Sequence, residues 1–445
     1  MSIDFKSKDF FYPLSILKFR SFLEKSQWSK KERLEEYQLK RLQIILKQAY
    51  EKVPYYQKLF RESGISPTDI ASLEDLKKIP LLSKNDLRKN FKRLTADNAL
   101  KFKPYLCRTS GTSGEPLQFY LDKPSNILEF CYYWRYWSWA GYRLGSPFAE
   151  FSIHHFLNHN LTEIYHYSRL MNRLILNSTQ VSYENMDKFI GAIKKYRPLF
   201  LKGAPATLYV FCLLLEKRGY SDLYFEAVFS TGEILLPVQR EKIERVLHCK
   251  ILDSYGHMER TVAISQCPEG AYHIHSEYGI LEVDKNEYFS SEGNIVGQII
   301  GTALHNFAMP LIRYKTTDLV EIDPAQKECR CGRSLPMIKS ICGRGQDIII
   351  TKDGHFITNL FVFFEFWKGI LWFQLIQEEL DKFSLNLVRG PDLEEKSLKI
   401  KVAELKNILG RQVSLDLEFL KLEEITPGSL KCRPIISRLD LNKYI

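Results

Sequence analysis

The chain has 445 residues, and because a single hydrophobic core stops growing beyond roughly 250–300 residues, this length favours one large domain with at least one smaller one. Hydrophobic residues make up 45% and charged residues 26%, which is ordinary for a folded globular chain and excludes disordered, collagen-like and membrane classes. The net charge of +10 favours an anionic ligand or an acidic membrane surface, and the basic residues are scattered without the basic block that marks nucleic-acid tails.

Neither export nor membrane insertion is expected. Residues 1–5 include the charged Asp4, where a signal peptide needs an uninterrupted apolar stretch. The most apolar run, residues 360–376, contains Glu365 and Lys368 and is shorter than the roughly 20 residues that span a bilayer. Nine cysteines, an odd number without a repeating framework, favour reduced thiols in the cytosol. We therefore expect a cytoplasmic protein without an integral membrane segment.

The first predicted elements are a helical lead and a loop. Residues 30–63 show helical periodicity. We expect a helix break at Val53-Pro54, because proline disfavours the helical conformation in the residue before it. Residues 108–116 (RTSGTSGEP) combine glycines with small hydroxyl residues, a composition whose backbone N–H groups can wrap a phosphate. An ordinary solvated turn has the same composition, so both interpretations stay open.

Further along, an aromatic segment at residues 130–139 (FCYYWRYWSW) is either a packed core helix or a source of pocket-lining rings. From about residue 180, the helical stretches 184–196, 206–218 and 237–247 alternate with β-type runs at 200–201, 227–230 and 250–252. This alternation is typical of βα units on a mainly parallel sheet, and it predicts an α/β large domain.

Beyond Gly297 the chain becomes strand-rich, with predicted strands at 298–303, 311–314, 371–376 and 383–388. The tail from about residue 343 reads strand, helix, strand, strand, helix, strand, which suits a small α+β domain. The glycines of residues 343–347 (GRGQD) allow large backbone changes, so we place the boundary there. The expected architecture is a large N-terminal domain at 1–342 with mixed sheets and helices, and a small mobile domain at 343–445.

Besides the loop at 108–116, the chain contains seven further motif segments. In chain order they are 49–56 (AYEKVPYY), before the loop, and 168–174 with 185–186, 230–233 (STGE), 255–259 (YGHME), 313–318 (RYKTTD), 343–347 and 427–434 (PGSLKCRP), after it. Together they resemble the adenylate-forming (acyl-AMP) ligases, in the phenylacetate–CoA ligase-like branch that includes capsular polysaccharide biosynthesis proteins. The resemblance runs through nearly the whole chain. It implies an AMP-forming acid ligase that uses ATP and Mg²⁺.

The resemblance implies that the loop holds the β- and γ-phosphates of ATP through Ser110, Gly111, Thr112, Ser113 and Gly114. Most relatives have a lysine after the last glycine, where this chain has Glu115. Gly232 and Glu233 match a strand-end turn beside the adenine, with backbone contacts; an ordinary helix N-cap region is the alternative.

The resemblance also assigns roles near residue 255. Tyr255 and Gly256 match an aromatic-glycine turn near the adenine, and Glu259 matches a ligand of the Mg²⁺ that bridges the phosphates. Core packing and a solvated surface are the structural alternatives. Asp318 matches the acceptor for the two ribose hydroxyls, although Thr317 replaces the usual glycine.

Toward the C-terminus, Arg344 matches the hinge of the small domain, and Lys431 matches the catalytic lysine that reaches the α-phosphate and the acyl oxygen, with Leu430 where many relatives have glycine. For the acid substrate, the resemblance indicates His154 and the small-residue turn Gly203-Ala204, whose side chains leave room for an acyl group.

A cysteine-rich set offers a metal site. Cys267, His273, Cys329 and Cys331 supply three thiolates and an imidazole, the ligands of a closed structural Zn²⁺ site, which some members of the resembled branch carry. His275 is a competing nitrogen ligand. Free cysteines near turns with a surface histidine are the alternative.

The expected function is ATP-dependent, AMP-forming ligation of an organic or amino acid, with transfer of the acyl group to a thiol, amine or hydroxyl, in surface polysaccharide biosynthesis. Two alternatives stay open: an aryl-acid CoA ligase, which consumes free CoA, and a nucleotide-binding scaffold without turnover, to which Glu115, Thr317 and Leu430 would point. The charged groups Glu259, Asp318 and Lys431 speak against the scaffold.

Overall fold

The computed structural model describes residues 13–108, 117–152, 154–157, 162–284, 294–326, 328–344, 349–352, 356–357, 360, 364, 367, 369–390, 393–410, 412–421 and 435–439. Its contacts divide the chain into two compact units. The first unit contains Met1–Leu144, Leu252–Thr316 and Val320–Ile341, and the second contains Gly145–Ile251, Thr317–Leu319 and Cys342–Ile445. The domain boundary expected between residues 342 and 343 stays a prediction.

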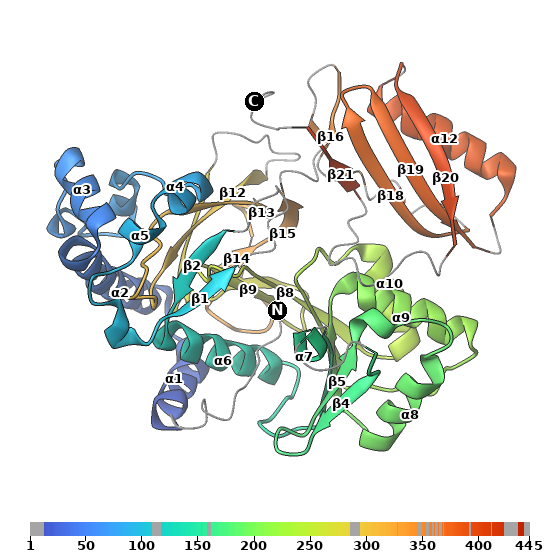
Figure 1. The fold of residues 1–445 in the computed structure, drawn as a ribbon, viewed down its shortest axis with the longest axis horizontal. Helices are drawn as coiled ribbons and strands as arrows, with labels where there is room; N and C mark the ends of the chain where they lie inside the picture. Colours follow the sequence, from blue (N-terminus) through green and yellow to red (C-terminus); the bar gives the residue numbers. More distant parts are fainter. Residues whose placement is uncertain are drawn as a thin grey trace. The chain divides into compact units, whose positions relative to one another are not determined.

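Helices open the first unit, and Figure 1 shows most of them gathered together: α1 (Pro13–Ser26), α2 (Lys31–Lys52), α3 (Pro54–Ser63), α4 (Lys84–Lys89) and α5 (Phe91–Leu94). The buried residues of α2, such as Leu42, Ile45, Leu46 and Ala49, recur at helical spacing and enter one core. Pro54 begins α3 at a position where its missing N–H costs nothing, so the predicted break at Val53-Pro54 is confirmed.

A hairpin frames the predicted phosphate loop. Strands β1 (Tyr105–Arg108) and β2 (Gln118–Leu121) pair antiparallel, with Arg108 opposite Gln118. Helix α6 (Lys123–Ser138) follows directly, capped by Asp122, whose carboxylate accepts a hydrogen bond from the Ser125 N–H at 3.0 Å. Most aromatic rings of α6 are buried, so this stripe is core packing in the first unit.

Two groups of strands lie mostly in the first unit. Strands β8 (Lys250–Gly256), β9 (Ala263–Gln266), β10 (Tyr272–Ile274) and β14 (Met337–Ile338) are neighbours in this order and pair antiparallel. A second sheet has the order β11 (Gly279–Asp284), β12 (Ile295–Ala303), β13 (Tyr314–Ile322) and β15 (Ser340–Arg344). The turn between β8 and β9 contains the motif that ends at Glu259.

The second unit contains the expected parallel strands. Their order is β7 (Ala227–Thr231), β6 (Phe200–Gly203), β3 (Phe148–Ser152) and β5 (Arg173–Asn177), all parallel, with β4 (Tyr165–Ser168) antiparallel at the edge. The helices are α7 (His154–Leu157), α8 (Met186–Tyr196), α9 (Pro205–Lys217) and α10 (Pro237–Leu247). Apolar residues of α8, α9 and α10 share one buried cluster with apolar residues of these strands. The side chains of a strand point alternately to its two faces, so the strand residues in this cluster come from the face that the helices cover.

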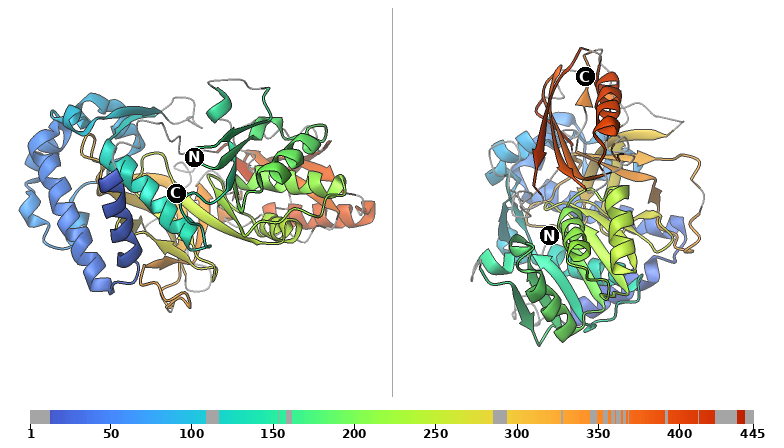
Figure 2. Two further views of the ribbon diagram at one scale, coloured as in Figure 1. Left: turned by 90° about the horizontal axis from the view of Figure 1, so that it is seen from below. Right: turned by 90° about the vertical axis from the view of Figure 1, so that its right-hand side faces the viewer.

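The C-terminal part of the second unit contains β16 (Ile349–Ile350), β17 (Phe356–Ile357), β18 (Ile370–Glu379), β19 (Lys382–Arg389), α12 (Glu395–Leu409), β20 (Ser414–Leu420) and β21 (Ile435–Ser437). One four-stranded sheet has the order β20, β19, β18, β21. Figure 2 shows α12 along one face of this sheet, where Leu398, Leu405 and Leu409 join the buried residues of β18 and β19.

The predicted α/β class is confirmed, and the helices and strands expected between residues 184 and 256 lie within two residues of their predicted starts. The strand expected at 311–314 is wrong in its start, since β13 begins only at Tyr314. Pro310 precedes this segment, and its ring removes a ladder donor and favours a turn. In the described part of the chain, no helix combines the length and the apolar character that a membrane span requires.

Candidate functional site

The motif at 255–259 ends in a buried carboxylate. Glu259 is 5% exposed and lies in the turn after β8. Its Oε1 accepts a hydrogen bond from the Tyr314 hydroxyl at 2.8 Å, and its Oε2 lies 3.0 Å from Nδ1 of His257. Each oxygen keeps a lone pair beyond these contacts. The expectation of a solvated surface glutamate is therefore excluded.

The charge state of Glu259 follows from its surroundings. Burial opposes the charged form, but the hydrogen bonds from His257 and Tyr314 and the charge of Lys84 outweigh it and lower the pKa of Glu259 to about 2. An ionised carboxylate that is partly held by protein donors is a ligand that Mg²⁺ prefers, since this ion is usually bound by one or two carboxylates together with phosphates. The carboxylate of Glu259 therefore fits the Mg²⁺ ion that the sequence predicts.

Tyr255 and Gly256 lie just before this turn, at the end of β8. The Tyr255 ring is half-buried and packs in part against a small core that includes Val262 and Ile264. A side chain placed on Gly256 would meet open space. The Tyr255 ring therefore takes part in core packing and is not fully buried.

Asp318 lies on β13, four residues after Tyr314, and is half-buried. An even spacing places both side chains on one face of the strand. Thr317 is accommodated within this strand, so a glycine is not required before Asp318.

In the second unit, the predicted residues follow the carboxyl ends of parallel strands. Gly203 ends β6 and Ala204 precedes α9, while Gly232 and Glu233 follow β7. His154 begins α7 after β3; its side chain lies outside the described residues. Since β3, β6 and β7 are parallel, these segments meet at one edge, where open α/β sheets bind their ligands.

Glu233 ties two of these loops together. Its Oε2 accepts a hydrogen bond from the Ala206 N–H at 3.1 Å, in the first turn of α9. Gly232 has φ +89°, a conformation that favours glycine. The carboxylate of Glu233 therefore caps a helix start, as in the structural alternative, and leaves the backbone at 232–233 for any ligand contact.

Several predicted residues fall outside the described part of the chain: Ser110, Gly111, Thr112, Ser113, Gly114 and Lys431. For Arg344 the backbone is described, as the end of β15, and the side chain is not. Their roles stay predictions.

The four cysteine and histidine residues meet in the first unit. Cys267 follows β9, His273 lies on β10, and Cys329 and Cys331 precede β14, and these strands are neighbours in the sheet. One ligand atom of each lies within 4.8 Å of all the others. The Sγ atoms of Cys267 and Cys329 are 3.7 Å apart. A tetrahedral site with Zn–S bonds of about 2.3 Å separates two sulfurs by about 3.8 Å, so the cluster has the spacing of a zinc site.

The histidine of this cluster is oriented as a ligand. Nδ1 of His273 lies 3.2 Å from the Leu335 carbonyl oxygen and donates to it, which leaves Nε2 directed at Cys331 Sγ, 3.3 Å away. Burial lowers the pKa of His273 to about 4, so the imidazole is neutral. Burial also raises the pKa of Cys329, to about 12, and a divalent cation would offset this, because a coordinating thiol is deprotonated.

His275 is committed elsewhere. It contacts the fully buried Arg135, whose guanidinium also pairs with Glu277 at 2.8 Å, and its ring stacks on Trp139. His275, the competing ligand candidate, is thus part of a buried ionic network, and it is absent from the cluster found among the described residues.

Comparison with known proteins places the chain. A family model described as the CapK C-terminal domain matches residues 349–437. Protein CapK of Staphylococcus aureus is 22% identical over 392 residues, covering 85% of this chain and 83% of that protein. A phenylacetate-coenzyme A ligase of Pseudomonas putida is 27% identical over 348 residues, covering 75% of each chain.

Among solved structures, a crystal structure of 2-hydroxyisobutyryl-CoA ligase in the postadenylation state superposes with a TM-score of 0.72 at 16% identity, covering 94% of this chain and 91% of that one. This superposition shows that the chain shares its fold with that ligase. The chain is a homologue of CapK and of the phenylacetate-coenzyme A ligases.

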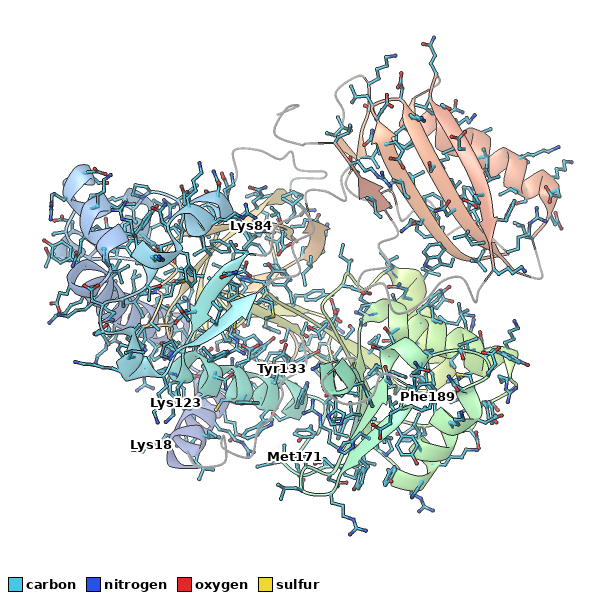
Figure 3. The ribbon with its side chains drawn as sticks, in the orientation of Figure 1. Lys18, Lys84, Lys123, Tyr133, Met171 and Phe189 are labelled. Atoms are coloured by element: carbon cyan, nitrogen blue, oxygen red, sulfur yellow. The ribbon has the colours of Figure 1, made fainter. Side chains whose placement is uncertain are left out.

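The sequence motifs did not assign a role to three residues of this candidate site. Tyr314 and His257 stand inside quoted motifs, and their spacing to Asp318 and Glu259 was the available signal. Lys84 begins α4, as labelled in Figure 3, and its charge acts on Glu259. The only sequence signal there is the capping box of Ser83 and Asp86, which predicts a helix start and no chemistry.

Proposed function

We propose that this adenylate-forming ligase activates an organic or amino acid with ATP and Mg²⁺ and transfers the acyl group to an acceptor in surface polysaccharide biosynthesis. The observation that supports adenylation best is the buried, ionised carboxylate of Glu259, held by Tyr314 and His257 within the motif expected to serve ATP. The match to Protein CapK supports the polysaccharide setting.

In the first half-reaction, a carboxylate oxygen of the acid forms a bond to the α-phosphorus of ATP. The bond from that phosphorus to its bridging oxygen breaks, and pyrophosphate leaves with the electron pair. Two anions must approach each other, so positive groups are needed around the phosphates. Mg²⁺ would supply part of this charge. Glu259 would hold that cation, and Lys431 would reach the α-phosphate and the acyl oxygen.

On their motif positions alone, we assign contacts with the adenine to Tyr255 and to the backbone of Gly232 and Glu233, and contacts with the ribose hydroxyls to Asp318. A half-buried tyrosine and a half-buried carboxylate are suited to these contacts.

We assign the acid to the carboxyl edge of the parallel strands, beside His154, Gly203 and Ala204. Gly203 has no side chain and Ala204 has only a methyl group. A Cβ at Gly203 would lie close to Leu208, so the packing of Leu208 disfavours a larger residue at position 203. Small residues at a strand end leave room for an acyl group.

In the second half-reaction, an acceptor thiol, amine or hydroxyl forms a bond to the acyl carbon, loses its proton and displaces AMP. A CoA ligase for aryl acids is the second candidate, because phenylacetate-coenzyme A ligases are among the relatives. The two candidates differ in the acceptor and share the adenylation step.

We also propose a structural zinc ion on Cys267, His273, Cys329 and Cys331, supported by the sulfur spacing and by the orientation of His273. Cytoplasmic location is proposed on the free thiols: the cysteines in the described ranges form no disulfide.

The test of this function is release of pyrophosphate from ATP and Mg²⁺, measured over a panel of aromatic, fatty, hydroxy and amino acids. Hydroxylamine traps any acyl-adenylate as a hydroxamate. Release with one acid class, and no added acceptor beyond hydroxylamine, supports adenylation. Acid-dependent consumption of free CoA favours the CoA ligase, whereas silence across the panel with ATP still bound favours a scaffold.

A further inference from the structure

The imidazole of His257 has both nitrogens occupied, and its partners define its tautomer. Nδ1 lies 3.0 Å from Glu259 Oε2, and because an ionised carboxylate only accepts, Nδ1 carries the proton and donates. Nε2 lies 2.9 Å from the Thr261 hydroxyl, so in the neutral ring it accepts a hydrogen bond from that hydroxyl. One turn thus contains a hydrogen-bonded series from Thr261 through His257 to Glu259.

Thr261 is a rigid anchor for this series. It is fully buried, and two glycines of neighbouring strands make room for it. A Cβ on Gly301 in β12 would overlap the Thr261 hydroxyl, and one on Gly279 in β11 would overlap the Thr261 carbonyl oxygen. The hydroxyl therefore has a fixed place in the core, and it holds the His257 ring from the side opposite Glu259.

The other side of the ring is also defined. The His257 imidazole stacks on Tyr314 with ring centroids 6.3 Å apart at 19°, and the Tyr314 hydroxyl donates to Glu259 Oε1. Both oxygens of Glu259 thus have a hydrogen-bond donor on a side chain that is itself held in place. Donors behind a ligating carboxylate set its direction and basicity.

From this geometry we infer that His257 is a positioning residue, which orients the carboxylate of Glu259 toward the divalent cation of the nucleotide complex and is itself fixed by Thr261. The inference rests on the proposed function, because it takes Glu259 as a ligand of that cation. It predicts that binding of the cation depends on a hydrogen-bond donor at the position of Nδ1 and does not depend on the imidazole ring itself.

Two matched pairs of substitutions, at His257 and at Thr261, test these hydrogen bonds separately. His257→Asn offers an amide N–H near the place of Nδ1 and keeps the donor to Glu259. His257→Gln extends its amide toward the place of Nε2, where it reaches Thr261 and leaves Glu259 without that donor. Thr261→Ser keeps the anchoring hydroxyl and Thr261→Val removes it. All four are made in the full chain, and their folding is checked by circular dichroism.

The readout is binding of Mn²⁺, followed by electron paramagnetic resonance in the presence of α,β-methylene-ATP, so no turnover is needed. Carboxylates accept Mn²⁺ as they do Mg²⁺. We expect His257→Gln to weaken the nucleotide-dependent Mn²⁺ site about 10- to 100-fold, the scale for loss of a partner behind a metal ligand, and His257→Asn to stay within about 3-fold. Thr261→Val should weaken the site and Thr261→Ser should not.

Equal losses in His257→Asn and His257→Gln, or no loss in either while the wild-type site is present, would overturn the inference and leave the proposed function standing. Absence of any nucleotide-dependent Mn²⁺ site in the wild-type protein would overturn both.

Discussion

The cysteine and histidine cluster gives the prediction that depends least on the unknown acid. Protein purified without chelators should contain one zinc ion per chain. The structure supports this through four ligand atoms within 4.8 Å of one another and through a Cys267–Cys329 sulfur separation of 3.7 Å, close to the value of about 3.8 Å for a tetrahedral zinc thiolate.

The perturbation is Cys331→Ser, which removes one ligand and leaves the Leu335 contact of His273 in place. Loss of a direct ligand should cost at least the 10- to 100-fold in affinity that loss of an outer partner costs. The matched control is Cys212→Ser, a buried cysteine on α9 in the other unit, which should retain full zinc content.

The assay combines metal analysis by mass spectrometry with thermal unfolding. With zinc at 100 times its dissociation constant, binding to the folded state alone adds about 2.7 kcal/mol of stability. At roughly 2–4 °C per kcal/mol for a unit of 150–250 residues, chelation should lower Tm by about 5–10 °C in the wild type and by much less in Cys331→Ser. Wild-type protein with no zinc, or a Tm indifferent to chelator, would refute this reasoning.

Three further predictions concern charge. Lys431→Ala should slow acid-dependent pyrophosphate release about 10²- to 10³-fold, as for the loss of one preorganised donor, and wild-type rates would contradict its catalytic role. Glu277→Gln leaves the guanidinium of the buried Arg135 without its carboxylate and should destabilise the protein by about 3–5 kcal/mol in urea unfolding. The double variant Arg135→Met with Glu277→Leu should lose less, and an equal loss would argue against an unpaired charge as the cause. The folded-state pKa of Glu259, about 2, lies below its ordinary value of 4.5, so its carboxylate adds stability above about pH 4.5 that is lost as the pH falls toward 2. The Tm difference between wild type and Glu259→Gln should therefore shrink over that range, and a constant difference would contradict the shifted pKa.

Local patterns predicted the elements of the second unit well. The helix expected at 237–247 is α10, and the strand expected at 227–230 is β7, because apolar spacing and flanking prolines act over a few residues. The same spacing does not state which strands become neighbours. That β6 lies between β3 and β7 depends on contacts between residues far apart in sequence.

In the candidate site, too, motifs predicted some residues, and the roles of others depend on contacts that only the fold creates. Glu259 and the cluster of Cys267, His273, Cys329 and Cys331 were predicted from motifs, because each residue type carries its own chemistry, and the structure brings the four cluster residues together. The roles of His257 and Tyr314 were not found, since a buried histidine or tyrosine is most often core packing, and only the fold brings their polar atoms to Glu259. His275 shows the converse, because residue type made it a ligand candidate and its neighbours made it part of an ionic network.

The central claim, that this ligase transfers AMP to a carboxylate, is tested most directly by isotope transfer. The acid that supports pyrophosphate release is supplied with ¹⁸O in both carboxylate oxygens, together with ATP and an acceptor, and the products are analysed by mass spectrometry. Attack of the carboxylate on the α-phosphorus predicts AMP with one ¹⁸O and unlabelled pyrophosphate. Unlabelled AMP, or label in inorganic phosphate together with ADP, would contradict adenylation.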